Sequence, residues 1–149
     1  MNPIEIIKAD HKKVESLFKK YEELGDKAFK TKKDLAMEIM NELSLHAEME
    51  ETILYPVLKD RFNKEGDKMV EEAYAEHGVA KDLIAELESL DPGDPQFDAK
   101  IKVLNENIDH HVKEEEEELL PRAEKELARE ELEDIGRKMK EFKDEEAKE

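Results

Sequence analysis

The chain has 149 residues and a formal net charge of −17, with 45% of its residues charged and only 5% aromatic. This length predicts one domain, and a charge-rich composition with few Gly, Pro and aromatic residues is typical of a helical bundle. The negative charge favours cations over nucleic acid or anionic membranes as partners, and the absence of cysteine excludes disulfides and thiolate metal sites.

Apolar residues recur every three to four positions in four main stretches, which predict helices around residues 4–21, 35–57, 70–87 and 97–119. Breaks at 25–26, 63–67 and 91–95 separate them. Because these connections are short, neighbouring helices should run antiparallel, which gives an all-α, up-down-up-down four-helix bundle over about residues 3–125. A weaker apolar stripe predicts an additional C-terminal helix at about 128–145, lying along the bundle.

Polar side chains interrupt these apolar stripes at six positions, namely His11, His46, Glu50, His77, His111 and Glu115. Burying ionised carboxylates without a cation is costly. A His and a Glu four residues apart share one helix face, so each such pair offers a nitrogen and an oxygen to the same small volume. Six ligands exceed one tetrahedral site, whereas two metals bridged by both carboxylates would each receive two nitrogens and two oxygens. We therefore expect a dinuclear centre of iron, manganese or zinc.

An internal duplication supports this interpretation. The stretch KADHKKVESLF resembles YAEHGVAKDLI, which pairs His11 with His77, and HAEMEETILYP resembles HVKEEEEELLP, which pairs His46 with His111. Two helix pairs related by a pseudo-two-fold axis would place equivalent residues symmetrically about the bundle centre. Pro56 and Pro121 end the two copies and indicate a kink or a helix end just beyond each ligand pair.

Two polar neighbours of His111 have different expected roles. His110 lies about 100° around the helix from His111, and we interpret it as a neighbour of the site, not a ligand. Most of the run Glu114–Glu118 should be a solvated face. Glu118 is the exception, because it returns to the metal-facing stripe where the first copy has Ile53. It is a candidate for a side chain that supports a ligand, or for a carboxylate on an entry path.

The ordered set of His11, His46-x-x-x-Glu50, His77 and His111-x-x-x-Glu115, with the endings LYP and LLP, resembles the HHE cation-binding branch of the hemerythrin family over about residues 3–125. The resemblance implies a single hemerythrin-like domain in residues 1–149. It also implies two iron ions with an oxo or hydroxo bridge inside the bundle, with manganese or zinc as substitutes. By this resemblance the four histidines are terminal ligands and the two glutamates bridge the metals.

One departure from the oxygen-carrying hemerythrins affects the expected function. Those proteins have a fifth histidine one turn before the third-helix histidine, where this chain has Ala73, and their fourth-helix histidine usually pairs with an aspartate five residues on, where this chain has Glu115 at four. With four histidines each metal keeps an open position, which suits a ligand that spans both metals, such as peroxide. We therefore favour redox chemistry on H2O2 or O2, including a catalase-like activity. The alternative is a reversible O2 carrier or an O2 or iron sensor, again with O2, peroxide or another small diatomic ligand as partner.

Tyr74 is the candidate for a hydroxyl close to this chemistry. It precedes His77 by three residues and lies on nearly the same helix face, where it could donate a hydrogen bond to an oxygen ligand. The alternative is a core tyrosine whose hydroxyl is satisfied elsewhere. The sequence leaves both open.

The sequence shows no signal for export or membrane insertion. It has no apolar run long enough to span a bilayer, and MNPIEIIKADHKKVE lacks the apolar region and cleavage site of a signal peptide. We expect a cytoplasmic protein.

Overall fold

The computed structural model describes residues 2–147, in which every regular element is helical. In chain order these elements are α1 (Pro3–Glu22), α2 (Phe29–Met49), η1 (Glu50–Leu54), α3 (Tyr55–Arg61), α4 (Lys64–Glu88), α5 (Pro95–Glu114), η2 (Glu115–Leu119), α6 (Leu120–Glu126) and α7 (Arg129–Ala147). The elements η1 and η2 are single turns of π-helix, so α2–η1–α3 and α5–η2–α6 each form one long rod.

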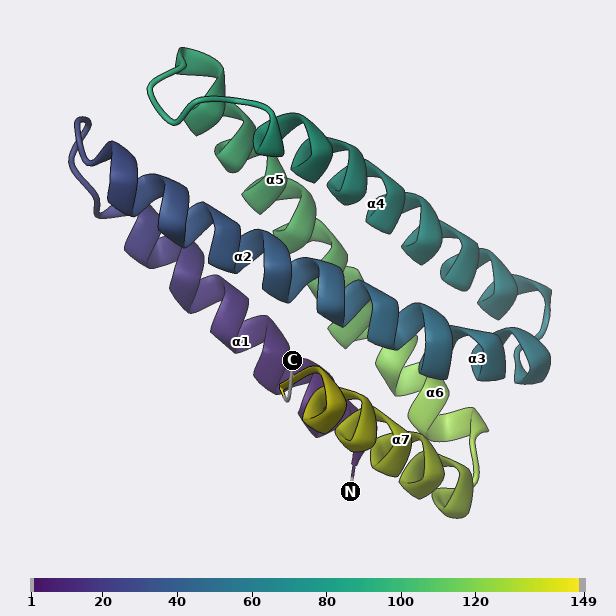
Figure 1. Ribbon diagram of the computed structural model, residues 1–149. Helices are drawn as coiled ribbons and strands as arrows, with labels where there is room; N and C mark the ends of the chain where they lie inside the picture. Colours follow the sequence, from purple (N-terminus) through teal and green to yellow (C-terminus); the bar gives the residue numbers. More distant parts are fainter. Residues whose placement is uncertain (1, 148–149) are drawn as a thin grey trace.

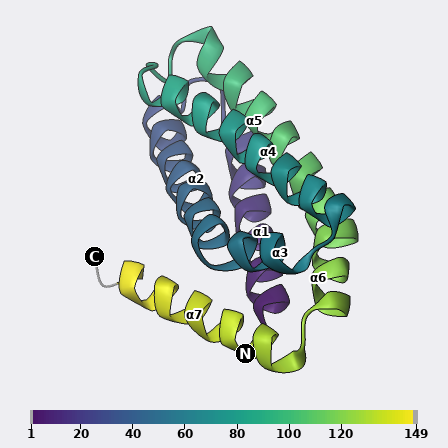
Figure 2. The same cartoon turned by 90° about the vertical axis from the view of Figure 1, so that its right-hand side faces the viewer.

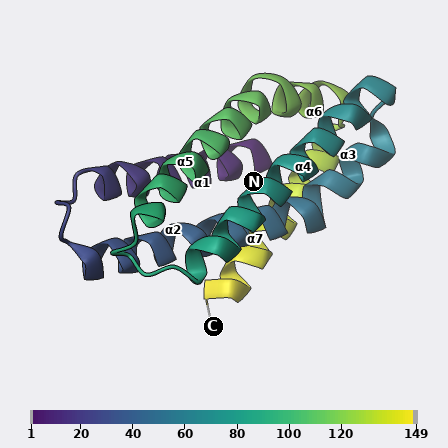
Figure 3. The ribbon, with the colours of Figure 1, turned by 90° about the horizontal axis from the view of Figure 1, so that it is seen from above.

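Four rods lie side by side and alternate in direction (Figures 1 and 3). The α1–α2 and α4–α5 connections lie at one end of the bundle and the α3–α4 connection lies at the other (Figure 1). The prediction of an all-α, up-down-up-down bundle with an additional C-terminal helix is confirmed. Among the described residues, no helix is long and apolar enough to cross a membrane.

Side-chain caps fix where the helices begin. The Asn2 side chain accepts a hydrogen bond from the Ile4 amide at 2.9 Å, and the Asp94 side chain accepts one from the Gln96 amide at 2.8 Å. A proline follows each cap, where its missing N–H costs nothing. Asn63 caps α4 in the same way through the Gly66 amide. The NKEGD stretch expected to separate two helices is therefore the first turn of α4.

The two π-turns begin at Glu50 and Glu115, the two predicted bridging residues. The Tyr55 amide donates to the Glu50 carbonyl and the Leu120 amide donates to the Glu115 carbonyl, five residues back in each rod. The next residue in each rod is a proline, which has no amide to continue the α-helical ladder. The expected helix end or kink is thus a single wide turn within a continuous rod.

Each π-turn inserts one residue and so rotates the helix face that follows it. In the first rod Leu54 and Leu58 are buried, where the sequence stripe had predicted Ile53 and Val57. In the second rod Leu119 is buried and Glu118 is exposed. The expectation that Glu118 continues the metal-facing stripe is wrong, because an uninterrupted α-helical period does not count the extra residue.

The core consists of two apolar clusters with a polar layer between them. One cluster lies toward the α1–α2 loop and includes Phe18, Ile39 and Phe97. The other includes Ile7 and Tyr55 together with residues of α7. The buried polar side chains between them are Asp10, His11, Glu50, His77, His111 and Glu115.

Helix α7 packs outside the four rods. Ile135 and Met139 of α7 are 3% and 0% exposed and belong to the same cluster as Ile4 and Ile7 of α1. Figure 2 shows that α7 lies against the bundle and crosses α1 obliquely near the N-terminal end of α1. It covers the part of α1 that leads to the polar layer.

Candidate metal centre

The structure brings all six predicted ligands into the polar layer, as two groups. In each group, one ligand atom of every residue lies within 4.8 Å of the others. One group contains His11, His46 and Glu115, and the other contains Glu50, His77 and His111. Each group therefore combines two histidines of one half of the chain with the glutamate of the other half.

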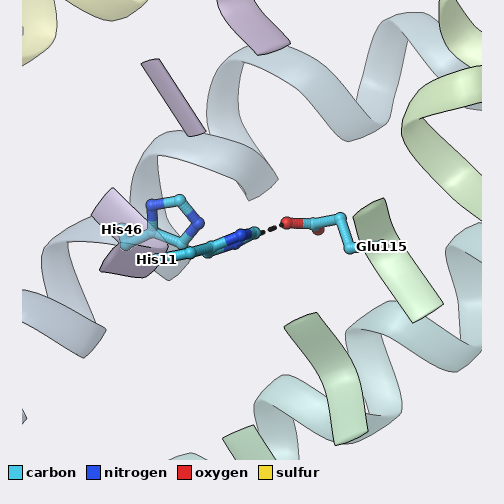
Figure 4. Close-up of side chains that lie close together, drawn as sticks. All are labelled: His11, His46 and Glu115. Carbon is cyan, nitrogen blue, oxygen red and sulfur yellow. Dashed lines mark ion pairs between the residues drawn. The ribbon is translucent and has the colours of Figure 1, made fainter. Parts of the chain in front are cut away.

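The two glutamates face both groups. Glu115 Oε1 lies 3.0 Å from His11 Nε2 (Figure 4), while its Oε2 lies 3.4 Å from His111 Nε2. Glu50 Oε1 lies 3.2 Å from His77 Nε2 and 3.4 Å from His46 Nε2. Both carboxylates are fully buried. Each glutamate therefore lies between histidines of the two groups.

The outer nitrogen of every histidine in the layer is held by a carboxylate. The Nδ1 atoms of His11, His46, His77 and His111 lie 2.6–2.8 Å from Glu116, Asp10, Glu51 and Glu76 respectively. A carboxylate only accepts, so Nδ1 carries the donating proton and Nε2 is left to face the layer. Carboxylate–histidine pairs of this kind fix the ring and raise its basicity as a metal ligand.

Sequence reasoning missed these four carboxylates, although the duplication contains a signal for them. Asp10 and Glu76 directly precede a ligand histidine, and Glu51 and Glu116 directly follow a ligand glutamate. In a chain with 42 acidic residues, this adjacency does not distinguish them from solvated Glu and Asp. Only the fold shows that each reaches a histidine on another helix.

A buried tyrosine completes the layer, and it is Tyr55. Its side chain is 0% exposed. Its hydroxyl lies 2.8 Å from Glu115 Oε2 and 3.1 Å from Glu50 Oε1, so the two carboxylates share its single proton as a hydrogen-bond donor. Burial raises the pKa of Tyr55 well above its usual value, and the Glu50 and Glu115 charges raise it further. The hydroxyl therefore keeps its proton. Tyr74, selected from the sequence, packs edge-on against Tyr55 with ring centroids 5.2 Å apart.

The other polar neighbours lie at the edge of the layer. His110 is exposed, and its Nε2 lies 3.0 Å from Glu114 and 3.5 Å from Glu76. It belongs to neither of these two groups, but with Glu76 and Glu114 it forms a third, more exposed group whose ligand atoms lie within 4.8 Å of one another. Glu118 is exposed and lines a small pocket that His111 and Glu115 also line, and its role on an entry path stays a prediction.

Protons and cations compete for the same atoms in this layer. Burial alone would lower the pKa of His46, but the Glu50 charge and the hydrogen bonds to Asp10 and Glu50 raise it to about 10. Burial would also lower the pKa of His111, and hydrogen bonds to nearby carboxylates raise it to about 12. Burial would raise the pKa of Glu50, yet the histidines hold it well below its usual value. Metal binding here must therefore release protons.

The donor set fits metal ions. Among the residues that the structure describes, Glu50 Oε2 is buried without a hydrogen-bond partner, while His11 Nε2 and Glu115 Oε1 face each other at 3.0 Å and His46 Nε2 faces Glu50 Oε1 at 3.4 Å. A buried polar atom is rarely left without a partner, because the cost is about 1–3 kcal/mol. Imidazole nitrogens and carboxylate oxygens converging on one small volume are ligands for a divalent or trivalent cation.

An apolar cavity meets the layer on the side of the α1–α2 loop. All four histidines of the layer line it, together with apolar side chains that include Val14, Leu43, Ala80, Ile84 and Ile108. Asp10, Ser44 and Lys81 also line it, but most of its wall is apolar. The cavity therefore offers a small uncharged molecule a dry contact with the metal-facing side of the histidines.

Fold and site together define a metal-binding helical-bundle domain, and comparisons with known proteins give its family. The hemerythrin HHE cation binding domain matches residues 2–123. The chain therefore belongs to the hemerythrin HHE cation-binding family, whose members bind metal cations.

Three relatives illustrate the range of the family. A hemerythrin HHE cation binding domain-containing protein from Mycobacterium kansasii, described as the homologue of Rv2633c, has the same fold, with a TM-score of 0.81, 25% sequence identity, and coverage of 97% of this chain and 86% of that one. An uncharacterized hemerythrin-like protein of Schizosaccharomyces pombe is 28% identical over 122 residues, which are 82% of this chain and 59% of that protein. A DNA nickase of Nostoc sp. is 31% identical over 133 residues, which are 89% of this chain and 36% of that protein. The chain thus spans roughly a third to three-fifths of the length of the last two relatives.

Proposed function

We propose that this chain binds two iron ions in the polar layer and uses them for redox chemistry on H2O2 or O2, with a catalase-like consumption of peroxide as the favoured activity. The observation that supports it best is that the layer contains two groups, each of two histidines and one glutamate. Glu115 lies 3.0 Å from a histidine of one group and 3.4 Å from a histidine of the other. Two histidines with one carboxylate and open positions are typical of non-haem iron sites that react with oxygen. Manganese and zinc are alternative occupants by ligand chemistry alone.

The residues would divide the work as follows. His11 and His46 would hold one ion, His77 and His111 the other, and the two glutamates would bridge them. Bound iron would supply one-electron transfer to and from oxygen species at the place where the ligands converge. No other described residue adds a fifth imidazole to the layer, because the position one turn before His77 is Ala73.

The surroundings of the layer favour peroxide or O2 as the substrate. The apolar cavity admits small uncharged molecules and disfavours charged ones, since its largely apolar walls would not replace the hydration of an ion. On the opposite side, the Tyr55 hydroxyl holds a proton within hydrogen-bonding distance of both glutamates. Disproportionation of peroxide, 2 H2O2 → 2 H2O + O2, requires protons to be moved between oxygen atoms, and Tyr55 is placed to hold one.

The alternative function within this class is a reversible O2 carrier or a sensor of O2 or iron, which would use the same layer without turnover. Cleavage of DNA, the activity named for the Nostoc relative, has less support in this chain. A net charge of −17 repels a phosphate backbone, and the chain matches only 36% of that protein.

Oxygen evolution from H2O2 tests the proposal. Iron-loaded protein should release one O2 for every two H2O2 consumed, over many turnovers per chain. Iron at equal concentration with the Glu50→Ala/Glu115→Ala variant serves as the control and should be far slower. Wild-type protein that takes up O2 reversibly and leaves peroxide unchanged would contradict the enzymatic proposal and support the carrier.

A further inference from the structure

Helix α7 reaches the candidate metal centre through one side chain. The Lys143 ammonium pairs with Asp10 Oδ1, and Asp10 Oδ2 accepts the hydrogen bond of His46 Nδ1 at 2.7 Å. Asp10 is only 8% exposed. A chain of three polar groups therefore runs from the C-terminal helix to a predicted metal ligand.

The apolar contacts of α7 bring Lys143 to this position. Met139 precedes Lys143 by one helical turn and is 0% exposed in the cluster that also contains Ile7 and Met49, one residue before the first π-turn. Phe142 packs against the same cluster. Since residues three and four apart share a helix face, burial of Met139 directs Lys143 toward α1.

The Asp10 carboxylate borders open space that would let it rotate. A cavity between α1, α2 and α7 is lined by Asp10, His46, Phe142 and Lys143. The nearby Lys13 is engaged with Glu42 at 2.7 Å. Asp10 is held in this setting by His46 on one oxygen and by Lys143 on the other.

The second half of the bundle has a different arrangement. The duplication makes Glu76 the equivalent of Asp10, and Glu76 holds His111 as Asp10 holds His46. Glu76 has no lysine beside it among the described residues, and its other imidazole neighbour is the exposed His110, at 3.5 Å. Helix α7 also lies beyond residue 123, where the match to the family ends. Among the described residues, the contact is therefore made in one half of the duplicated site and has no counterpart in the other.

We propose that Lys143 is a positioning residue of the metal centre, which orients His46 by fixing the Asp10 carboxylate and so makes α7 part of the site. With both oxygens engaged, the carboxylate cannot turn away, and the imidazole keeps Nε2 directed into the layer. This inference rests on the proposed metal site but not on its redox activity. Removing Lys143 should loosen His46 and weaken the hold on the ion beside it.

Release of metal to a chelator tests this inference without any activity measurement. Metal-loaded Lys143→Met should lose one of its ions about tenfold faster than wild type, at the lower end of the effect of outer-sphere changes. Lys143→Arg should restore most of the wild-type rate, because it keeps a cation. Lys140→Met, at an exposed lysine on the same helix, is the matched control and should release metal at the wild-type rate.

A double-mutant cycle separates positioning from a general structural effect. If Lys143 acts through Asp10, then Lys143→Met should accelerate release in the wild-type background and add nothing in the Asp10→Asn background. An equal acceleration in both backgrounds, an unchanged rate or a slower release would each overturn the inference. Wild-type protein that binds no metal would instead contradict the proposed function, so the two failures are distinguishable.

Discussion

The two halves of the bundle are alike in the layer that meets the metals and differ immediately around it. The pair α1 with α2–α3 and the pair α4 with α5–α6 each contribute two histidines, one glutamate, two outer carboxylates and one π-turn, in the same order along the chain. Around this layer Tyr55 stands where the second half has Leu120, and Ile7 where the second half has Ala73. The residues that the two halves share are the candidate metal ligands and the carboxylates that hold them. The residues that differ, such as Tyr55 and Leu120, lie beside the ligands and would influence the reaction there.

The π-turns show what this repetition achieves. In each half the π-turn starts at the glutamate, Glu50 or Glu115. The histidine four residues earlier therefore stays on the same helix face as that glutamate, while the residues after the turn are rotated by one position. That rotation brings Tyr55 against the carboxylates in one half and Leu120 into the core in the other. The same backbone device therefore gives the two halves different neighbours.

The largest expected effect comes from removing a bridging residue. Glu115→Ala should lose at least one metal per chain, because Glu115 faces histidines of both groups. Glu117→Ala, two residues along and exposed, is the control and should lose none. Elemental analysis after iron loading measures both. Equal metal contents in the two variants would show that Glu115 does not hold the ions.

Metal removal should make the stability of the fold depend on pH. The folded-state pKa values of His46 and His111, about 10 and about 12, lie above the unfolded value of about 6.5, so protonation of these rings stabilises the metal-free fold. This contribution is fully present below a pH of about 6.5 and is lost as the pH rises toward 10 and above. Glu50 acts in the opposite direction, and its contribution is lost as the pH falls below its usual pKa.

Melting temperatures of metal-free protein at pH 6, 8 and 10 check this expectation. They should decrease along that series, while metal-loaded protein should melt higher at each pH and vary less, since the ions take the place of the protons. Metal-free and metal-loaded protein with the same melting temperature at neutral pH would mean that the layer does not bind metal.

A smaller effect separates the two tyrosines. Tyr55→Phe removes the donor shared by the two glutamates and should destabilise the metal-free protein by about 1–3 kcal/mol, as expected when buried acceptors lose a partner. Tyr74→Phe removes a hydroxyl outside the layer and should change stability by no more than about 0.5 kcal/mol. Chemical denaturation gives both values, and a larger effect from Tyr74→Phe would show that the wrong tyrosine has been assigned.

The smallest expected effect concerns Ala73, the position where oxygen-carrying members of the family have a fifth histidine. Ala73 is 4% exposed and lines the small pocket shared by His111 and Glu115, so an imidazole at this position can reach the layer. Ala73→His should reduce peroxide consumption without abolishing it and should favour reversible uptake of O2. A variant that consumes peroxide faster than wild type would contradict the importance of the open positions.

The sequence was sufficient to predict the bundle and the six histidine and glutamate side chains that the fold gathers in the layer, because both depend on periodicity. A polar residue in an apolar stripe, such as His77, is visible without a structure, and the doubled spacing of His46 with Glu50 and His111 with Glu115 marks a shared volume. The π-turns could not be predicted in the same way. A single extra residue does not change the apolar periodicity that precedes it. The prolines indicated only that the regular helix is disturbed.

The missed residues depend on contacts between helices. Tyr55 was overlooked because an ordinary α-helix would turn it away from Glu50. Asp10 was overlooked because its two partners, His46 and Lys143, are 36 and 133 residues away in the chain. Such pairs follow from how the rods pack, and the sequence contains no local signal for that packing.

Metal content after reconstitution tests the central claim most directly, since the proposed chemistry depends on two ions in one layer. Protein loaded with iron, freed of excess metal and analysed for iron and protein should contain two iron ions per folded chain, and the Glu50→Ala/Glu115→Ala variant should contain none. A wild-type value of one or less would contradict the dinuclear centre.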